Sequence, residues 1–413
     1  MSVAAAEGVI ELAVQSIAAG GDGVGRSEGL VVFVPRTAPG DVARVRIDSA
    51  KRFARGRLVE ILTPSSARID PPCTHYRVDA CGGCQIQHIR YAAQLEAKQG
   101  IVRDTITRIA KRSVEIPRTR PSAREWRYRT KLTLAMRHDS GHWKMGLHPY
   151  DDPMGVFQLE DCPITDERIV AAWREIMGAA AFLPPSQELR GTVRLADEEI
   201  VVLIMGGATW PTDRAFFDAV RSASALWWAP EESVQRLLHE RRHAPAGTSF
   251  GQINTAVAEE LRAHVVDLVK AYAPATVVDA YSGTGETATR LAALGATVTA
   301  IELDRDAAAV CAARLPPGSR CLVGRVESVL MKALPADIVI VNPPRAGLHE
   351  RVTATLEREG PPRVIVYVSC DPATLARDLT RLPSYRIASI ATFDMFPQTA
   401  HVETVCELVP AAG

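Results

Sequence analysis

The segment Val278–Thr287 has the sequence VDAYSGTGET, in which an apolar strand ends in a glycine-containing turn and a helix begins. Gly283 and Gly285 let a ligand approach the backbone at the carboxyl edge of a sheet, which is where α/β folds bind their ligands. This order of elements favours a doubly wound sheet that binds a nucleotide-type cofactor. The motif alone does not identify the cofactor, because dinucleotide folds use it as well.

The chain around this segment alternates between apolar strands and helices from Ala275 onward. Near-continuous apolar strands separated by helices indicate a doubly wound, mostly parallel sheet. An amphipathic helix is predicted just before the sheet, over Ala256–Tyr272. The predicted strands are Thr276–Asp279, Thr297–Glu302, Asp337–Val341 and Val364–Val368.

The second predicted strand ends in the sequence IELD, Ile301–Asp304. An acidic residue about twenty residues after the glycine turn can accept both hydroxyls of a ribose. Glu302 and the turn together therefore fit an adenosine-containing cofactor, either S-adenosylmethionine or a dinucleotide. The alternative is that these carboxylates are surface groups at strand ends.

The third and fourth strands deliver further candidates to the same edge. The third runs into NPPRAGL, Asn342–Leu348, whose two prolines fix a rigid loop or serve as a merely structural turn. The fourth delivers Cys370, and a helix beginning near Pro372 would favour its thiolate, although cysteine is also a common buried residue. Glu403 lies in an alternating strand and could act as a base if it faces a pocket, whereas most such residues point to solvent.

A cluster of cysteines occurs outside this region. Three stand within twelve residues, and a fourth precedes a proline, as is common at iron–sulfur sites. Four thiolates suit an iron–sulfur cluster or structural zinc, and the spacing does not decide between them. His75 and His88 are possible ligands in the zinc interpretation and otherwise polar loop residues. The four cysteines are Cys73, Cys81, Cys84 and Cys162.

The first 64 residues contain short strand patterns separated by glycine-rich turns, which fits a small β-barrel of the oligonucleotide-binding type. The run KRFARGR at Lys51–Arg57 supplies charge and one aromatic ring, or forms a plain solvated hairpin. Residues 1–131 carry 22 Lys/Arg against 13 Asp/Glu, and the rest of the chain carries 26 against 35. This asymmetry favours a basic face for a polyanion, with chance variation of surface charge as the alternative.

The composition excludes several classes of protein. The chain has 413 residues, of which 47% are hydrophobic and 23% charged, so it is no collagen, disordered tail or coiled-coil rod. Apolar runs stay shorter than the ~18 residues that a membrane helix needs. Met1–Glu7 does not resemble a signal peptide, so a cytoplasmic location is predicted, where clustered thiols indicate a metal rather than disulfides.

Together these motifs resemble those of the S-adenosylmethionine-dependent RNA uracil-5-methyltransferases, in particular the bacterial 23S rRNA branch that carries an iron–sulfur cluster. The resemblance covers nearly the whole chain. It rests on CGGCQIQH at Cys81–His88, FGQIN at Phe250–Asn254, the Ser-Cys-Asp-Pro sequence around Cys370 and the His-Val-Glu sequence that ends at Glu403.

The resemblance implies an α/β protein of three domains. Residues 1–64 would form a TRAM-like, RNA-binding β-barrel, and residues 65–245 an α+β central domain with the cluster. Residues 246–413 would form a doubly wound, Rossmann-like methyltransferase domain. The four cysteines would then hold a structural 4Fe–4S cluster rather than zinc. The implied partner is RNA, with no membrane and no obligate protein partner.

The resemblance also assigns roles to single residues. Cys370 would add to carbon-6 of uracil, and Glu403 would remove the proton from carbon-5. The residues that would bind the cofactor are Gln252, Tyr281, Glu286, Glu302 and Asn342. The chain departs from the family pattern at Asn342, where the family usually has Asp, and at Glu286-Thr287, where it has Asn-Phe.

Three other functions compete with methylation of 23S rRNA. One is methylation of a uridine in the tRNA T-loop. Another is a non-catalytic RNA-binding factor of ribosome assembly, suggested by the departures at Asn342 and Glu286. The third is a redox enzyme that uses the cluster and a dinucleotide.

Overall fold

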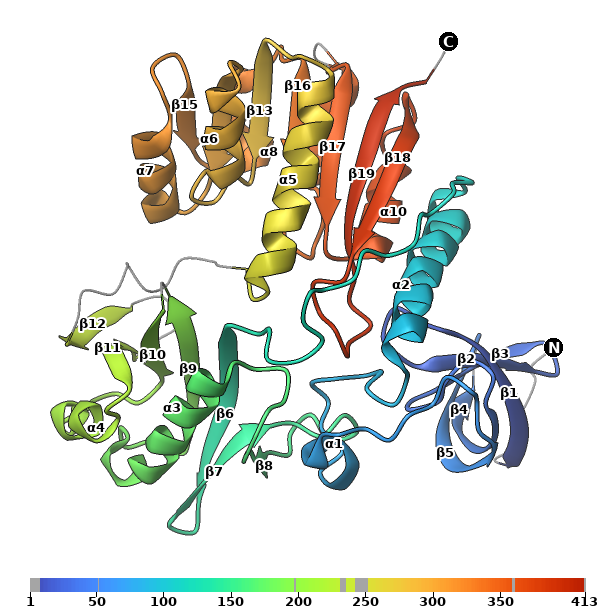
Figure 1. Ribbon diagram of the computed structural model, residues 1–413, viewed down its shortest axis with the longest axis vertical. Helices are drawn as coiled ribbons and strands as arrows, with labels where there is room; N and C mark the ends of the chain where they lie inside the picture. The colour runs from blue at the N-terminus through green and yellow to red at the C-terminus, as the bar shows by residue number, and fades with distance from the viewer. Residues whose placement is uncertain are drawn as a thin grey trace.

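The computed structural model describes residues 8–50, 52–196, 198–230, 235–241, 252–358 and 361–411. In these ranges the chain forms a closed barrel and two seven-stranded sheets, which make up three parts of the molecule (Figure 1). Of the segments singled out above, residues 1–7, Lys51, Phe250 and Gly251 lie outside the described residues.

The N-terminal part is a closed barrel with strand order β1-β2-β3-β5-β4. Its interior is filled by inward-facing apolar side chains such as those of Leu12, Val32 and Val45, which are almost completely buried. The barrel predicted from the strand spacing is therefore confirmed. Its strands are β1 (Val9–Ile17), β2 (Gly23–Ser27), β3 (Leu30–Val34), β4 (Val42–Ala50) and β5 (Ala54–Thr63).

A segment with little regular structure follows the barrel and carries three of the four clustered cysteines. It contains one short helix and one long helix, and the long helix ends in a π-helical turn. This segment leads from the barrel into the central sheet. Its helices are α1 (Thr74–Val78), α2 (Tyr91–Thr105) and the turn Ile106–Ala110.

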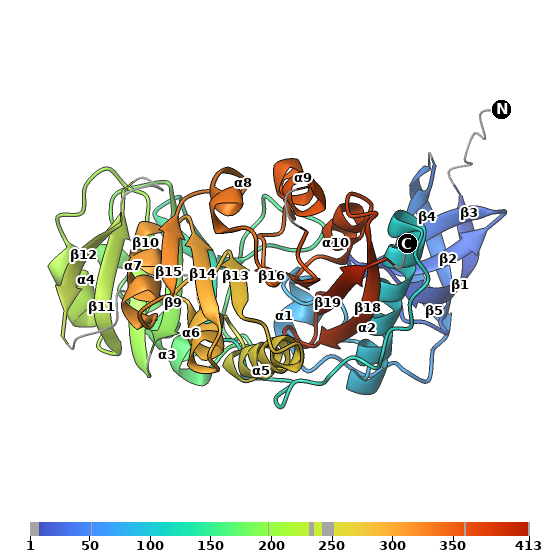
Figure 2. The same cartoon turned by 90° about the horizontal axis from the view of Figure 1, so that it is seen from above.

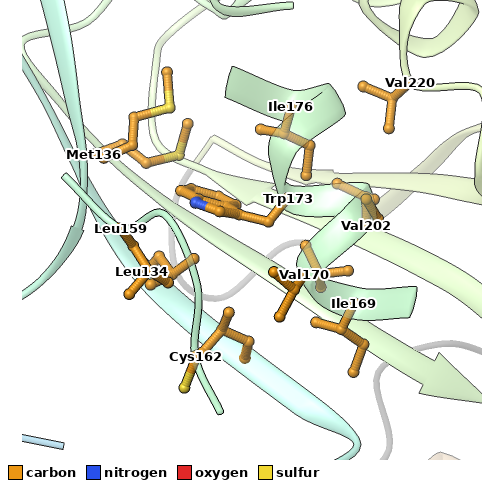
Figure 3. Close-up of a cluster of buried hydrophobic side chains, with 14 of the residues drawn as sticks. Leu134, Met136, Leu159, Cys162, Ile169, Val170, Trp173, Ile176, Val202 and Val220 are labelled. Carbon is orange, nitrogen blue, oxygen red and sulfur yellow. The ribbon is translucent and has the colours of Figure 1, made fainter. Parts of the chain in front are cut away.

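The central part is a mixed sheet with strand order β12-β11-β10-β9-β6-β7-β8. Two helices, α3 and α4, cover one face through a core around the fully buried Trp173 (Figure 3). Cys162 belongs to the same core, so the cysteine cluster is tied to this sheet. The elements are β6 (Lys131–Asp139), β7 (His142–Leu147), β8 (Phe157–Gln158), α3 (Glu167–Gly178), the 3-10 turn Ala180–Phe182, β9 (Glu188–Ala196), β10 (Glu199–Met205), α4 (Asp213–Ala219), β11 (Ala223–Ala229) and β12 (Arg236–Glu240).

The C-terminal part is the predicted doubly wound sheet, with strand order β15-β14-β13-β16-β17-β19-β18. The strands from β15 to β17 are parallel, and β19 runs antiparallel between β17 and β18. Helices α5, α6 and α7 cover one face, and α8, α9, α10 and the end of α2 cover the other. The elements are α5 (Thr255–Ala271), β13 (Thr276–Ala280), α6 (Glu286–Ala293), β14 (Thr297–Glu302), α7 (Arg305–Arg314), β15 (Arg320–Val323), α8 (Val326–Val329), the 3-10 turn Leu330–Ala333, β16 (Ile338–Val341), α9 (Glu350–Arg358), β17 (Val364–Ser369), α10 (Pro372–Leu379), β18 (Tyr385–Phe393) and β19 (Glu403–Pro410).

The three parts are packed around the carboxyl edge of the C-terminal sheet. The barrel and the central sheet lie on opposite sides of the molecule (Figure 2), and β17 points toward the region between them (Figure 1). Arg36 of the barrel donates to the carbonyls of Tyr76 at 2.6 Å and Cys81 at 3.4 Å, which joins the barrel to the cysteine segment. Among the helices in the described ranges, none has the length and apolar character needed to cross a bilayer.

Candidate active site

Cys370 lies in a tight turn between the buried strand β17 and the helix α10. The Ser369 hydroxyl accepts a hydrogen bond from the Asp371 amide at 3.1 Å. The Asp371 carboxylate caps α10 by accepting from two backbone amides of its first turn. The helix begins at Pro372, as the sequence predicts. These contacts fix the backbone on both sides of the thiol.

Strand pairing brings Glu403 opposite Cys370. Ser369 at the end of β17 pairs with Thr404 in the antiparallel strand β19. Cys370 directly follows Ser369 and Glu403 directly precedes Thr404, so the two residues come together just beyond the last pair of the ladder, where the Glu403 carboxylate acts on the Cys370 thiol. Two candidates that are distant in sequence therefore face the same edge of the sheet.

The charges around the thiol set its ionisation. Burial raises the pKa of the Cys370 thiol, the carboxylate of Glu403 raises it further, and the guanidinium of Arg345 opposes both. Glu403 is 6% exposed, and burial raises its pKa to about 7, again against Arg345. Burial and the Glu403 carboxylate therefore act against the thiolate that the start of α10 was expected to favour.

Arg345 is a charged neighbour of the thiol that was not predicted as a site residue. It is exposed in the loop after β16, and its positive charge acts on Cys370, Glu403 and His401. Because β16 and β17 are adjacent parallel strands, their carboxyl ends bring this loop next to the nucleophile's turn. The available signal was a cation placed directly after the proline pair Pro343-Pro344 at a strand end.

Two cavities open along the same edge, and Tyr281 lines both of them. The first has a volume of about 670 Å³ and is also lined by Glu302. The second has a volume of about 580 Å³ and is lined by Gln252, Glu286 and Asn342. The structure thus brings all five predicted cofactor residues to these two cavities.

The turn between β13 and α6 has a backbone that allows close approach of a ligand. Gly285 adopts a φ of 78°, and a Cβ at this position would lie 2.4 Å from the Sγ of buried Cys311. Tyr281 also has a positive φ, of 65°, which is uncommon for a bulky residue. Only glycine fits at position 285, so this part of the predicted motif has a direct steric cause.

Three carboxylates at this edge have different surroundings. Glu302 accepts from the Gly283 amide at 2.8 Å and, through its other oxygen, from the two amides that follow it, so its orientation is fixed. Glu286 forms an ion pair with Arg262. Asp279 is 3% exposed, its Oδ2 has no hydrogen-bond partner among the described residues, and burial raises its pKa to about 7. Asp279 was not among the predicted site residues, although an acidic residue at the end of an apolar strand is a signal that a sequence offers.

The four clustered cysteines line one enclosed cavity of about 190 Å³ beside the central sheet. Each of them is between 7% and 9% exposed, and the three other thiols act electrostatically on Cys84. Within the described residues, no group of three or more His, Cys, Asp or Glu side chains is placed so that it could hold a metal ion. The predicted donors therefore share a cavity but are not arranged around one point.

The two histidines near this cavity have other partners. His75 has Nδ1 bonded to the Asp79 carboxylate at 2.7 Å, and its Nε2 accepts from the Glu160 amide at 3.0 Å. His88 is bonded through Nδ1 to the Tyr76 hydroxyl at 2.7 Å and does not line the cavity. The interpretation in which these histidines complete a zinc site finds no support in their hydrogen bonds.

Sequence families match both ends of the chain. The family described as tRNA (Uracil-5-)-methyltransferase matches residues 318–409, and the TRAM domain matches residues 9–59. The first range contains Cys370 and Glu403, and the second covers most of the barrel.

Individual proteins match over almost the full length. The chain is 32% identical to an uncharacterized RNA methyltransferase of Thermosynechococcus vestitus, over 99% of both chains. It is 29% identical to an uncharacterized RNA methyltransferase of Listeria monocytogenes, over 97% of both chains. Among solved structures, the tRNA (uracil-54, C5)-methyltransferase of Pyrococcus abyssi in complex with S-adenosyl-L-homocysteine matches with a TM-score of 0.71 and 27% identity, covering 97% of this chain and 99% of that one.

Proposed function

The chain belongs to the S-adenosylmethionine-dependent RNA uracil-5-methyltransferases, and on that premise we propose that it methylates carbon-5 of one uridine in 23S rRNA through a covalent adduct with Cys370. The observation that carries this proposal is that Cys370, directly after β17, lies beside Glu403 at the start of β19, whose charge acts on the thiol. A redox enzyme or a non-catalytic assembly factor has no use for a thiol and a buried carboxyl group that face each other beside cofactor-sized cavities.

The first half of the reaction makes carbon-5 a nucleophile. Carbon-5 of uracil does not attack a methyl donor by itself. The Cys370 thiolate adds to carbon-6, and the electron pair of the C5=C6 bond forms an enolate. Carbon-5 then attacks the methyl carbon of S-adenosylmethionine, the S–CH₃ electron pair returns to sulfur, and S-adenosylhomocysteine results.

The second half of the reaction releases the product. Glu403 takes the proton from carbon-5, the C–H electron pair restores the C5=C6 bond, and the Cys370 thiolate leaves carbon-6. A positioned base typically contributes ~10²–10⁴-fold. The pKa of about 7 suits this role, because Glu403 is then partly ionised near neutral pH and accepts a proton readily.

Arg345 supplies the positive charge that both anionic stages require. Its charge opposes the effect of burial on Cys370 and on Glu403. We assign it the stabilisation of the thiolate before addition and of the enolate after it. Because Arg345 is exposed, the bound RNA must cover it before this stabilisation reaches its full strength.

The two cavities divide the cofactor between them. Glu302 lines the first cavity with its orientation already fixed, which suits it to accept from ribose hydroxyls. Gln252 and Asn342 line the second cavity, where the methionine end would lie. The unpartnered oxygen of Asp279 in this cavity is suited to accept from the cofactor's ammonium group.

The cysteine cavity is proposed to hold a 4Fe–4S cluster. All four thiols line it, and both nearby histidines form hydrogen bonds with other groups. Such a cluster would join the cysteine segment to the central sheet, and no step of the methyl transfer moves an electron. Anaerobically purified protein should contain iron and sulfide and be brown, and a colourless protein containing zinc would contradict the assignment.

The substrate class follows from the barrel and from the chemistry. Phe53 is 48% exposed, and the side chains of Arg55 and Arg57 are 66% and 74% exposed. Exposed cations and an aromatic ring suit phosphate contacts and base stacking on single-stranded RNA. A uridine must be turned out of its helix or loop to place both faces of its ring in this site.

A tRNA uridine is the second candidate substrate. The Pyrococcus abyssi enzyme that matches this chain almost end to end is a tRNA (uracil-54, C5)-methyltransferase. Unmodified 23S rRNA and unmodified tRNA, each incubated with methyl-labelled S-adenosylmethionine, separate the candidates. We expect label in 5-methyluridine of 23S rRNA, at one position that mapping of the product identifies. Label in tRNA alone would favour the second candidate, and no 5-methyluridine in either RNA would refute the proposed function.

A further inference from the structure

Lys98, in the middle of α2, forms a completely buried ion pair. Its ammonium donates to the Asp394 carboxylate and, at 3.0 Å, to the Phe396 carbonyl, and both charged side chains are 0% exposed. Removing two charges from water is so unfavourable that well-packed apolar residues in their place are often equally stable or more so. The presence of this pair in spite of that cost indicates that it fixes the position of α2 relative to the segment that contains Asp394.

Asp394 begins the segment that leads to Glu403. Residues 394–402, which we call the catalytic loop, connect β18 to β19 and descend from the sheet toward the middle of the molecule (Figure 1). Phe393, directly before Asp394, is the cross-strand partner of Glu403. The contact with Lys98 therefore holds the loop one residue away from the partner of the proposed base.

A second contact holds the tip of the catalytic loop. Gln94 lies one helical turn before Lys98, so both side chains project from the same face of α2. The Gln94 amide donates to Gln398 Oε1 at 2.8 Å and accepts from the Gln398 backbone amide at 3.0 Å. Gln398 has a φ of 71°, so the tip is held in a backbone conformation that non-glycine residues rarely adopt.

The far end of α2 is anchored beside the nucleophile. Val102 near the end of α2, and Ile106 at the start of the π-helical turn, are fully buried in the same core as Leu375 and Leu379 of α10. Helix α10 begins two residues after Cys370. One rigid helix thus contacts both the loop before the base and the helix after the nucleophile.

We propose that Lys98 and Gln94 are positioning residues that set Glu403 against carbon-5 of the covalent adduct. This inference rests on the proposed function of Glu403. The step that depends on them is the last one, in which Glu403 takes the carbon-5 proton, the C–H electrons form the C5=C6 bond and the Cys370 thiolate leaves. Binding of the cofactor and formation of the adduct use other residues and should not depend on the side chains of Lys98 and Gln94.

The test replaces the ion pair by apolar residues of similar size. Lys98→Met alone would leave a buried, unpaired carboxylate and could unfold the protein, so the working variant is Lys98→Met/Asp394→Leu. We expect its turnover to fall by up to ~10²-fold, because small misplacements of a reacting group have effects of this size. Its affinity for S-adenosylhomocysteine should be unchanged, and a protein–RNA adduct carrying the transferred methyl group should accumulate on denaturing gels.

Two further variants make the result decisive. Glu96→Ala, on the exposed face of the same helix, should turn over like the wild type. Glu403→Gln should accumulate the same methyl-labelled adduct as the double variant. If Glu403→Gln accumulates it and the double variant does not, the positioning role is wrong while the proposed function stands. If the double variant loses cofactor affinity and adduct formation together, its role is general stability and the inference is also wrong. If Glu403→Gln turns over normally, the assignment of the base fails and the inference fails with it.

Discussion

The cofactor crevice and the reacting edge of the same sheet are built in different ways. The crevice is built largely from the loops after parallel strands, with Gln252 before α5 added to it, and its key turn, Val278–Thr287, is contiguous in sequence. The reacting edge pairs Cys370 with Glu403 through antiparallel strands and depends on a helix from a distant segment. We propose that the first arrangement binds a small molecule and that the second aligns two groups that act in separate steps.

This difference has a consequence for mutations. In the crevice, several residues share the binding of one ligand, so each substitution should change affinity by a modest factor. At the reacting edge, each group acts on one bond, so a substitution should stop one step and leave the binding of S-adenosylmethionine intact. The comparison therefore predicts two classes of variant that separate binding from chemistry.

The largest effect is expected for Cys370→Ala. Without the thiolate, carbon-5 cannot become nucleophilic, and turnover should fall by more than ~10⁴-fold, as for other enzymes that lose a nucleophile. Calorimetric affinity for S-adenosylhomocysteine should stay within twofold, and RNA with 5-fluorouracil at the target should no longer trap the protein. If Cys370→Ala retained 1% of the activity, Cys370 would not be the nucleophile. The proposed difference between the reacting edge and the cofactor crevice would then be wrong.

The next effect is that of Glu403→Gln. The amide cannot take a proton, so turnover should fall by ~10²–10⁴-fold while the methylated adduct still forms. In the wild type, Glu403 must be ionised to act, so the rate of product release should rise with pH through about 7. Single-turnover measurements between pH 5.5 and 8.5 should show this rise in the wild type and not in the variant. An identical pH profile in both proteins would assign the base to another group.

The contrast also explains what the sequence could predict. The predicted strand Thr276–Asp279 agrees with β13 to within one residue, because an apolar strand, a glycine turn and a helix are specified by neighbouring residues. Gly285 was predicted from the same local pattern, although the contact that excludes a side chain at this position comes from Cys311 of α7. The barrel was predictable for a similar reason, since short alternating strands and glycine turns repeat along its sequence.

The reacting edge could not be predicted in this way. The residue that lies beside Cys370 depends on the register between β17 and β19, which tertiary packing sets. The strand pattern left open whether Glu403 faces a pocket or solvent, and only the family resemblance chose between the two. Lys98 gave no signal, because a lysine is expected to be exposed and its partner Asp394 is 296 residues away. The burial that raises the pKa of the Cys370 thiol could not be predicted either, because the amount of burial is a property of the whole fold.

Arg345→Met should have an intermediate effect. Loss of the guanidinium should raise the pKa of the Cys370 thiol further, because the positive charge that opposes burial is gone. A rise of about one pKa unit slows adduct formation by about tenfold at neutral pH. Reactions with the 5-fluorouracil RNA, stopped at successive times, should show this tenfold slower formation of the adduct. The pH at which the rate of adduct formation is half-maximal should move to a higher value. Arg351→Met on the exposed face of α9 is the matched control, and an equal loss in both variants would indicate weaker RNA binding instead.

The smallest effect is expected in the crevice, for Asn342→Asp. Asn342 lines the second cavity together with Gln252 and Asp279, on the side assigned to the cationic end of the cofactor. A carboxylate forms a stronger hydrogen bond to a cation than an amide does, by about 1 kcal/mol, so the affinity for S-adenosylmethionine should increase about fivefold. Calorimetry at low and high salt should show a gain that shrinks with salt, while the rate of adduct formation at saturating cofactor stays unchanged. Ala354→Asp, which adds the same charge to the exposed side of α9, should leave the affinity as it is. If Asn342→Asp instead changed the rate of adduct formation and not the affinity for S-adenosylmethionine, Asn342 would act in the chemical step. It would then belong to the reacting edge and not to the cofactor crevice.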